Sequence, residues 1–129
     1  MINQISSTNK EETKYDLVER TAVFGESILD FVGGVERNSI NNPLISQVVR
    51  SGTSVGANYC EANEANSKKD FVHKVSIAKK EAKETIHWLR MIIKVNSALR
   101  ERAEILQKES HELVLIFSAI MRKSTGREV

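Results

Sequence analysis

Apolar and small residues recur at alternating steps of three and four along almost the whole chain, and this spacing restricts the fold more than any other feature. Such a pattern places them on one face of an α-helix, the face that packs against other helices. The chain has a single proline in 129 residues, and its sequence lacks the alternation typical of strands. The sequence therefore predicts long helices around one shared core.

Four such seams follow one another. The first predicts a helix over 15–37, in which Gly33 and Gly34 favour fraying, a kink or close packing because each costs about 1 kcal/mol inside a helix. The second predicts a helix that starts at Asn42 and Pro43, since asparagine caps free amide groups and proline suits the first helical position. The seams consist of Leu17, Thr21, Phe24, Ile28, Phe31 and Val35; Ile45, Val48, Gly52, Val55, Tyr59, Ala62 and Asn66; Phe71, Val75, Ala78, Ala82, Thr85, Leu89, Ile92 and Ile93; and Leu99, Ala103, Leu106, Ser110, Leu113, Phe117 and Ile120.

The third helix begins at a capping signal. Ser67 can accept a hydrogen bond from the first turn, and Asp70 suits the positive end of the helix. We expect only a residue or two between the second and third helices, which makes them antiparallel neighbours. The third helix should end near Val95, with Asn96 and Ser97 as stop and restart, and the fourth should fade before Gly126.

These elements predict an all-α fold, an antiparallel up-down-up-down four-helix bundle over residues 15–124. A flexible N-terminal segment, 1–14, and a flexible C-terminal tail, 125–129, flank it. Two glycines on the second seam, Gly52 and Gly56, should let a facing helix approach closely. The N-terminal segment has no apolar core of the signal-peptide type, and no run approaches the ~18 apolar residues of a membrane span, so a cytoplasmic protein is expected.

Charge is distributed unevenly along the chain. Residues 1–42 carry four basic and seven acidic side chains, whereas residues 67–97 carry eight basic and three acidic ones. On a helical wheel, all but one of these basic residues fall on one side of the third helix, over a length of roughly 40 Å at ~1.5 Å per residue. This stripe is a candidate nucleic-acid-binding face with the reach to follow a phosphate backbone, or alternatively an ordinary solvated surface. It comprises Lys68, Lys69, Lys79, Lys80, Lys83, Arg90 and Lys94.

Two further faces are candidate oligomer interfaces. On the third helix, a second apolar face carries the only tryptophan of the chain, which predicts either self-association or closure of the core by Trp88. On the second helix, a stripe of small residues with a charge at each end lies opposite the seam, and it is either an interface or a plain exposed face. The candidate interface residues are Arg50, Ser54, Ala57, Glu61, Ile77, Glu81, Glu84, Trp88 and Met91.

Catalytic and metal chemistry has little support in the sequence. Glu84 and His87 have the spacing of a di-iron bundle element, but that chemistry needs a second such motif on another helix. The lone Cys60 allows no intrachain disulfide, and we expect it to be a buried or half-buried structural residue. We therefore expect no enzymatic activity, cofactor or metal. The phenylalanines lie on core seams, so any nucleic-acid contact should be mainly to phosphates, with weak sequence specificity and strong salt dependence.

The segment from Arg50 to Asn58, with the pairs Glu61-Ala62 and Ile77-Ala78 and the run Lys69-Asp70-Phe71, resembles a known family. Glu81, Glu84 and Trp88 complete the resemblance. The family comprises four-helix-bundle proteins encoded in intervening sequences of bacterial 23S ribosomal RNA, and it is similar in turn to the accessory variability proteins of diversity-generating retroelements. The chain departs from the usual pattern at Tyr59-Cys60 and at Asn63.

The resemblance implies a ring-shaped homopentamer of antiparallel four-helix bundles in the bacterial cytoplasm, without a well-defined activity. The retroelement relatives bind nucleic acid and a reverse transcriptase. The positions that match the polar pattern of the family imply roles in packing and assembly, and they are Arg50, Ser54, Asn58, Glu61, Asp70, Glu81 and Glu84.

Two functions are consistent with this sequence. The first is a homo-oligomeric, non-enzymatic bundle that binds RNA or DNA backbone through the basic side of the third helix. The second is a protein–protein scaffold or adaptor with no nucleic-acid role, in which the lysines aid solubility or pair with the acidic first helix of a neighbour.

Overall fold

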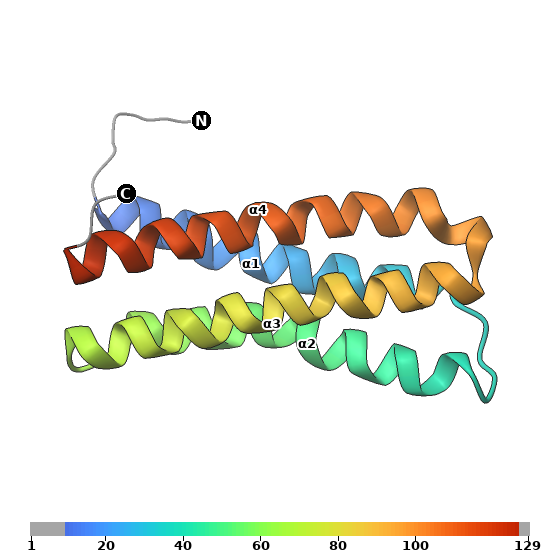
Figure 1. Cartoon of the computed structure of the whole chain (residues 1–129). Helices are drawn as coiled ribbons and strands as arrows, with labels where there is room; N and C mark the ends of the chain where they lie inside the picture. The colour runs from blue at the N-terminus through green and yellow to red at the C-terminus, as the bar shows by residue number, and fades with distance from the viewer. Residues whose placement is uncertain (1–9, 127–129) are drawn as a thin grey trace.

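The computed structural model describes residues 10–126, which form four α-helices and one short 3₁₀ helix (Figure 1). The elements are α1 (Lys10–Val32), α2 (Asn41–Asn63), α3 (Lys68–Val95), η1 (Ser97–Leu99) and α4 (Arg100–Thr125).

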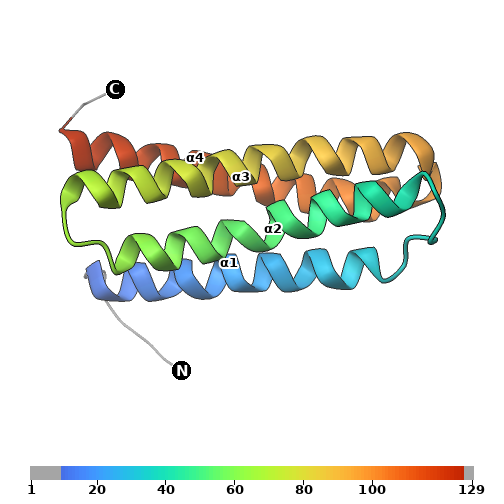
Figure 2. The ribbon, with the colours of Figure 1, turned by 90° about the horizontal axis from the view of Figure 1, so that it is seen from below.

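Consecutive helices run antiparallel and pack side by side, and α1 also contacts α4, so the four helices close into a bundle. α1 does not contact α3 in the described part of the chain, which places these two helices on a diagonal. Figure 2 shows the start of α1 and the end of α4 at the same end of the bundle. The predicted all-α four-helix bundle is confirmed.

The predicted seams form the core. In every helix most seam residues are buried, and Phe24, Phe31 and Phe117 are among the largest side chains without solvent contact. Three seam residues, Phe71, Leu99 and Ile120, are only partly buried and pack against the core from its ends.

The bounds of α1 differ from the prediction at both ends. It begins at Lys10 rather than at residue 15, so part of the predicted N-terminal segment is helical, while residues 1–9 lie outside the described part. It ends at Val32 rather than at residue 37, and amides beyond it, such as that of Gly34, bond three residues back, to Phe31 at 3.0 Å. Val35 is nevertheless buried, which explains why the apolar spacing outlasts the helix.

The cap of α2 also differs from the prediction. Asn42 does not cap the helix. Instead, Asn38 Oδ1 accepts from the amides of Ile40, at 3.0 Å, and Asn41, at 2.7 Å, and the helix begins at Asn41. Pro43 consequently occupies the third helical position rather than the first.

Asn41, which follows this cap, connects the α1–α2 connection to the α3–α4 connection at the same end of the bundle. Its side chain is buried and exchanges two hydrogen bonds with the Asn96 amide, at 3.1 and 3.0 Å. Asn96 lies between α3 and η1, where the sequence predicted a break. The pair thus links the α1–α2 connection to the α3–α4 connection.

The ends of α3 and α4 agree with the prediction, except at the turn before α3. Ser67 Oγ accepts from the amide of Asp70 at 3.0 Å, and Gly126 follows α4 with φ 78°, a left-handed conformation that suits glycine. The connection from α2 to α3 comprises residues 64–67 and is longer than predicted. Asn66, predicted on the seam, lies in it and is exposed, because α2 has already ended at Asn63.

The two seam glycines of α2 bring it close to α1, as predicted. A methyl group at Gly52 would lie 2.8 Å from Ile28 Cγ1, and one at Gly56 would lie 3.3 Å from the backbone of Thr21. Ile28 is fully buried and cannot move aside without displacing other core residues. Close approach of the helices therefore depends on the missing side chains.

Gly52→Ala should lower the free energy of unfolding by about 1–3 kcal/mol, because the added methyl group overpacks this contact. Gly25→Ala is the matched control on the same interface, since its methyl group would meet its nearest neighbour at an ordinary 3.6 Å. The control should be neutral or gain up to about 1 kcal/mol of helix propensity. Urea unfolding followed by circular dichroism measures both, and equal stabilities for the two variants would contradict the close-contact explanation.

Candidate nucleic-acid interface

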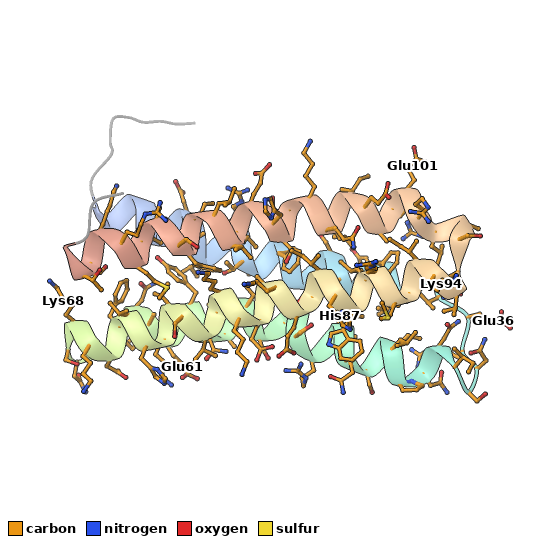
Figure 3. The ribbon with its side chains drawn as sticks, in the orientation of Figure 1. Glu36, Glu61, Lys68, His87, Lys94 and Glu101 are labelled. Carbon is orange, nitrogen blue, oxygen red and sulfur yellow. The ribbon has the colours of Figure 1, made fainter. Side chains whose placement is uncertain are left out.

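The seven predicted basic residues lie along one side of α3, and we call them the basic face. Six are exposed, and Lys79 is half-buried. Figure 3 shows Lys68 and Lys94 at opposite ends of α3, with His87 between them. The basic face comprises Lys68, Lys69, Lys79, Lys80, Lys83, Arg90 and Lys94.

No side chain of the basic face takes part in an ion pair with another described residue. The cations that do so are Arg20, Arg50, Lys74 and Arg100. Lys74 is the one lysine of α3 outside the basic face, and it turns toward α2, where its Nζ lies 2.7 Å from Glu61 Oε1. This hydrogen bond is the main reason that the pKa of Lys74 is raised. The positive charge of the basic face is therefore not compensated within the described chain.

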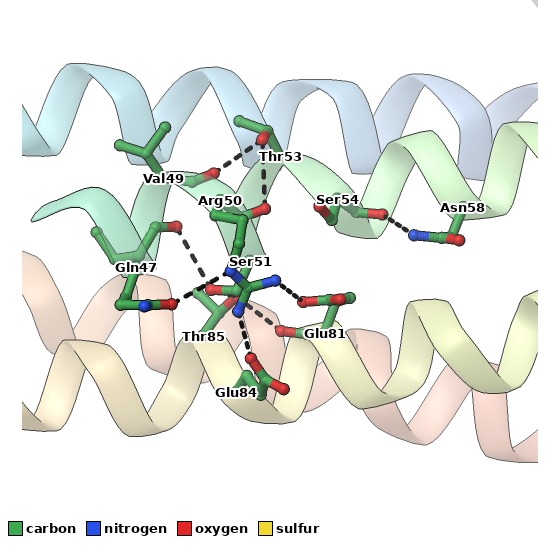
Figure 4. Close-up of polar contacts among 11 residues, drawn as sticks. Gln47, Val49, Arg50, Ser51, Thr53, Ser54, Asn58, Glu81, Glu84 and Thr85 are labelled. Atoms are coloured by element: carbon green, nitrogen blue, oxygen red, sulfur yellow. Dashed lines mark hydrogen bonds and ion pairs between the residues drawn. The ribbon is translucent and has the colours of Figure 1, made fainter. Parts of the chain in front are cut away.

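Two carboxylates beside the basic face are neutralised from the opposite side. Arg50 of α2 reaches across to α3, where Nη1 lies 3.0 Å from Glu81 Oε1 and Nη2 lies 2.5 Å from Glu84 Oε1 (Figure 4). The hydrogen bond to Glu84 is the main cause of the raised pKa of Arg50. Apart from Asp70 in the first turn, these are the only acidic residues of α3. Their pairing with Arg50 leaves the field of the lysines dominant.

The middle of the basic face borders an open groove of about 550 Å³. Three lysines of α3 line it, together with Ser76, Glu84 and His87 of the same helix and Met121 of α4. A smaller hollow of about 230 Å³ adjoins it at Lys79 and Met121, and Arg122 of α4 lines this hollow. The groove lysines are Lys79, Lys80 and Lys83.

Arg122 of α4 was not among the residues predicted for the basic face. It extends the basic face from α3 onto α4, but the helical wheel of a single helix contains no information about the neighbouring one. The only sequence signal for Arg122 is that it is one of the basic residues in the last turn of α4. This signal is unspecific, because basic residues are favourable at the negative, C-terminal end of any helix.

The predicted interface stripe on α2 lies where the spacing placed it, but its two charges are paired within the chain. Arg50 binds Glu81 and Glu84, and Glu61 binds Lys74. Between them, Ala57 is exposed and Ser54 is half-buried. The charged ends therefore hold α2 against α3, and a subunit contact over this stripe stays a prediction.

The second apolar face of α3 is half-buried at Ile77, Trp88 and Met91. Trp88 packs against the core, and its ring meets that of His87 edge-on at 4.9 Å between centroids. Its Nε1 is buried and has no hydrogen-bond partner among the described residues. Self-association through this face also stays a prediction.

The prediction for Cys60 is wrong, because the side chain is exposed. Tyr59 takes the buried seam position, so its neighbour points away from the core and lines an apolar groove between α1 and α2. Within residues 10–126, no three His, Cys, Asp or Glu side chains are grouped closely enough to hold a metal ion. No helix in this range is both long and apolar enough to cross a membrane.

Fold and surface together define an antiparallel helical bundle with a basic face that no residue of the range 10–126 neutralises through an ion pair. A family model described as 23S rRNA-intervening sequence protein matches residues 13–119, so the chain belongs to that family. The chain is also similar to a protein with unknown function from the S23 ribosomal protein family of Bacteroides thetaiotaomicron, whose crystal structure is known. The two are 33% identical with a TM-score of 0.73, over 82% of this chain and 98% of that one. A comparison with curated proteins found no match.

Arg50→Gln should lower the free energy of unfolding by about 1 kcal/mol, the upper end for exposed ion pairs, because it leaves the mostly buried Glu81 without its partner. The Glu81 side chain is 14% exposed. Arg100→Gln is the matched control, since it removes an ion pair in which both side chains are more than half exposed, and less than ~0.5 kcal/mol should be lost.

Thermal or urea unfolding at low salt measures the free energy of unfolding that each variant loses. The difference between the two losses should become smaller as added NaCl screens the charges. Equal losses for the two arginines would show that Arg50 contributes no more than an ordinary surface pair.

Proposed function

We propose that this protein is a non-enzymatic, homo-oligomeric bundle that binds the phosphate backbone of RNA or DNA through the basic face. The observation that carries the proposal is a row of basic side chains without ion-pair partners among the described residues, beside carboxylates that Arg50 neutralises. Phosphates are the anions that such a row can meet repeatedly, and each contact releases counterions.

The groove beside α3 supports the same function. Lys80 and Lys83 are exposed on its wall, and Arg122 extends the positive surface onto the next helix. Lysine is a mobile point charge without a fixed bonding geometry, so it favours phosphates over base edges. Binding should therefore depend weakly on sequence.

The assembly and the partners belong to the proposal as well. A homopentamer in the bacterial cytoplasm and a reverse transcriptase as protein partner follow from the family resemblance. The half-buried apolar face around Trp88 and Met91 supports self-association, because a subunit interface would cover it.

The second candidate function is a scaffold that binds only protein. It is favoured by the acidic outer side of α1, which lies diagonally opposite the basic face and exposes Asp16, Glu19, Glu26 and Asp30. The basic face of one copy could pair with α1 of the next, and such head-to-tail contacts produce rings when they close. The lysines would then be covered by a neighbouring subunit rather than by nucleic acid.

The double variant Lys80→Glu/Lys83→Glu should abolish binding to structured RNA at low salt, because it reverses the charge at the centre of the basic face. Arg37→Glu/Lys123→Glu is the matched control. Its charge change is equal, but Arg37 lies in the α1–α2 connection and Lys123 borders α1. Fluorescence anisotropy measures affinity, which for the wild type should fall steeply from about 50 mM to about 200 mM salt.

Sedimentation of the same proteins without nucleic acid separates the two functions. If the bundle binds nucleic acid, the Lys80/Lys83 variant keeps its assembly and loses only RNA affinity. Dissociation of the assembly by this variant, with no RNA binding by the wild type even at low salt, would favour the scaffold.

A further inference from the structure

We propose, building on the proposed function, that the nucleic acid bound by the basic face is a double helix rather than a single strand. Proteins that bind single strands combine a positive groove with aromatic side chains on which successive bases stack. Binding of a single strand therefore requires aromatic side chains beside the lysines, whereas binding of a duplex does not.

The described aromatic rings do not form a stacking platform. Phe24, Phe31, Tyr59 and Phe117 are buried, and Phe71 and Trp88 pack against the core. The groove beside the basic face contains a single ring, His87, and one edge-on contact ties this ring to Trp88. Apart from His87, bases of a single strand would meet only non-aromatic side chains there, those of the three lysines, Ser76, Glu84 and Met121. A duplex keeps its bases inside and needs no such ring.

The spacing of the basic face also suits a duplex. Its residues form three clusters, with Lys68 and Lys69 at one end, the groove lysines in the middle, and Arg90 and Lys94 at the other end. At ~1.5 Å per residue, the centres of the outer clusters lie about 35 Å apart. One turn of a B-form duplex is about 34–36 Å long, so a straight helix beside it meets the same strand once per turn.

The intervals between the clusters contain no unpaired cation. From residue 70 to 78 the only lysine or arginine is Lys74, which turns toward Glu61, and from 84 to 89 there is none. A single strand presents a phosphate at every nucleotide, so evenly spaced basic residues would match it best. Three separated clusters instead match the ridges of a duplex, where the middle cluster meets the opposite strand.

The test compares a duplex of about 16 base pairs with its own single strands, in DNA and in RNA, by anisotropy at low salt. The expected result is at least about tenfold tighter binding of the duplex than of its strands in one of the two chemistries. Single strands that bind as tightly as the duplex in both chemistries would overturn the proposal. Absence of binding to every probe would instead refute the proposed function itself.

Charge density alone could favour a duplex, so a length series and a variant complete the experiment. Duplexes from about 6 to about 16 base pairs should show a step in affinity near one turn, where both outer clusters first make contact. Lys68→Ala/Arg90→Ala should remove this step while circular dichroism stays unchanged, since both side chains are exposed. A smooth rise with length in the wild type, or a step that survives in the variant, would contradict the assignment.

Discussion

The apolar seam of α3, buried between α2 and α4, is the constraint on which the rest of the structure depends. Val75, Ala78, Ala82 and Leu89 have no solvent exposure, so the orientation of this helix about its axis is fixed. Rotation of α3 would expose these residues and bury lysines, at a cost of several kcal/mol for each uncompensated charge. Packing of the core thus dictates that the basic side chains lie together on one outer side of α3.

A second interaction determines the net charge on this side of α3. Arg50 crosses from α2 to Glu81 and Glu84, so one contact both attaches α2 to α3 and cancels the carboxylates nearest to the lysines. The Lys74–Glu61 pair is a second ion pair between the same two helices, nearer to the α2–α3 connection. Stability and surface charge are therefore coupled, because the ion pairs that hold α2 against α3 also occupy the carboxylates that lie nearest to the basic face in the described structure.

The sequence predicted helices and core well because both depend on periodicity. Residues such as Val48 and Leu113 lie on seams and are fully buried, as expected. Helix ends were predicted less well, because they depend on single contacts. Asn38 caps α2 in place of Asn42, and the apolar spacing at Val35 continues beyond the end of α1. Cys60 was expected to be buried or half-buried because free cysteines usually are, but it is exposed beside Tyr59, which fills the seam.

For the candidate site, the sequence by itself determined the fold class, the burial of the seams and the alignment of the basic residues on one side of α3, because a helix fixes the directions of its own side chains. Only the tertiary structure decided which charges remain unpaired and what adjoins them. Arg50 of α2 contacts Glu81 and Glu84 of α3, and Arg122 of α4 lines the same hollow as Lys79 of α3. Such contacts depend on the rotation and offset of one helix against another, which periodicity along one chain segment does not specify.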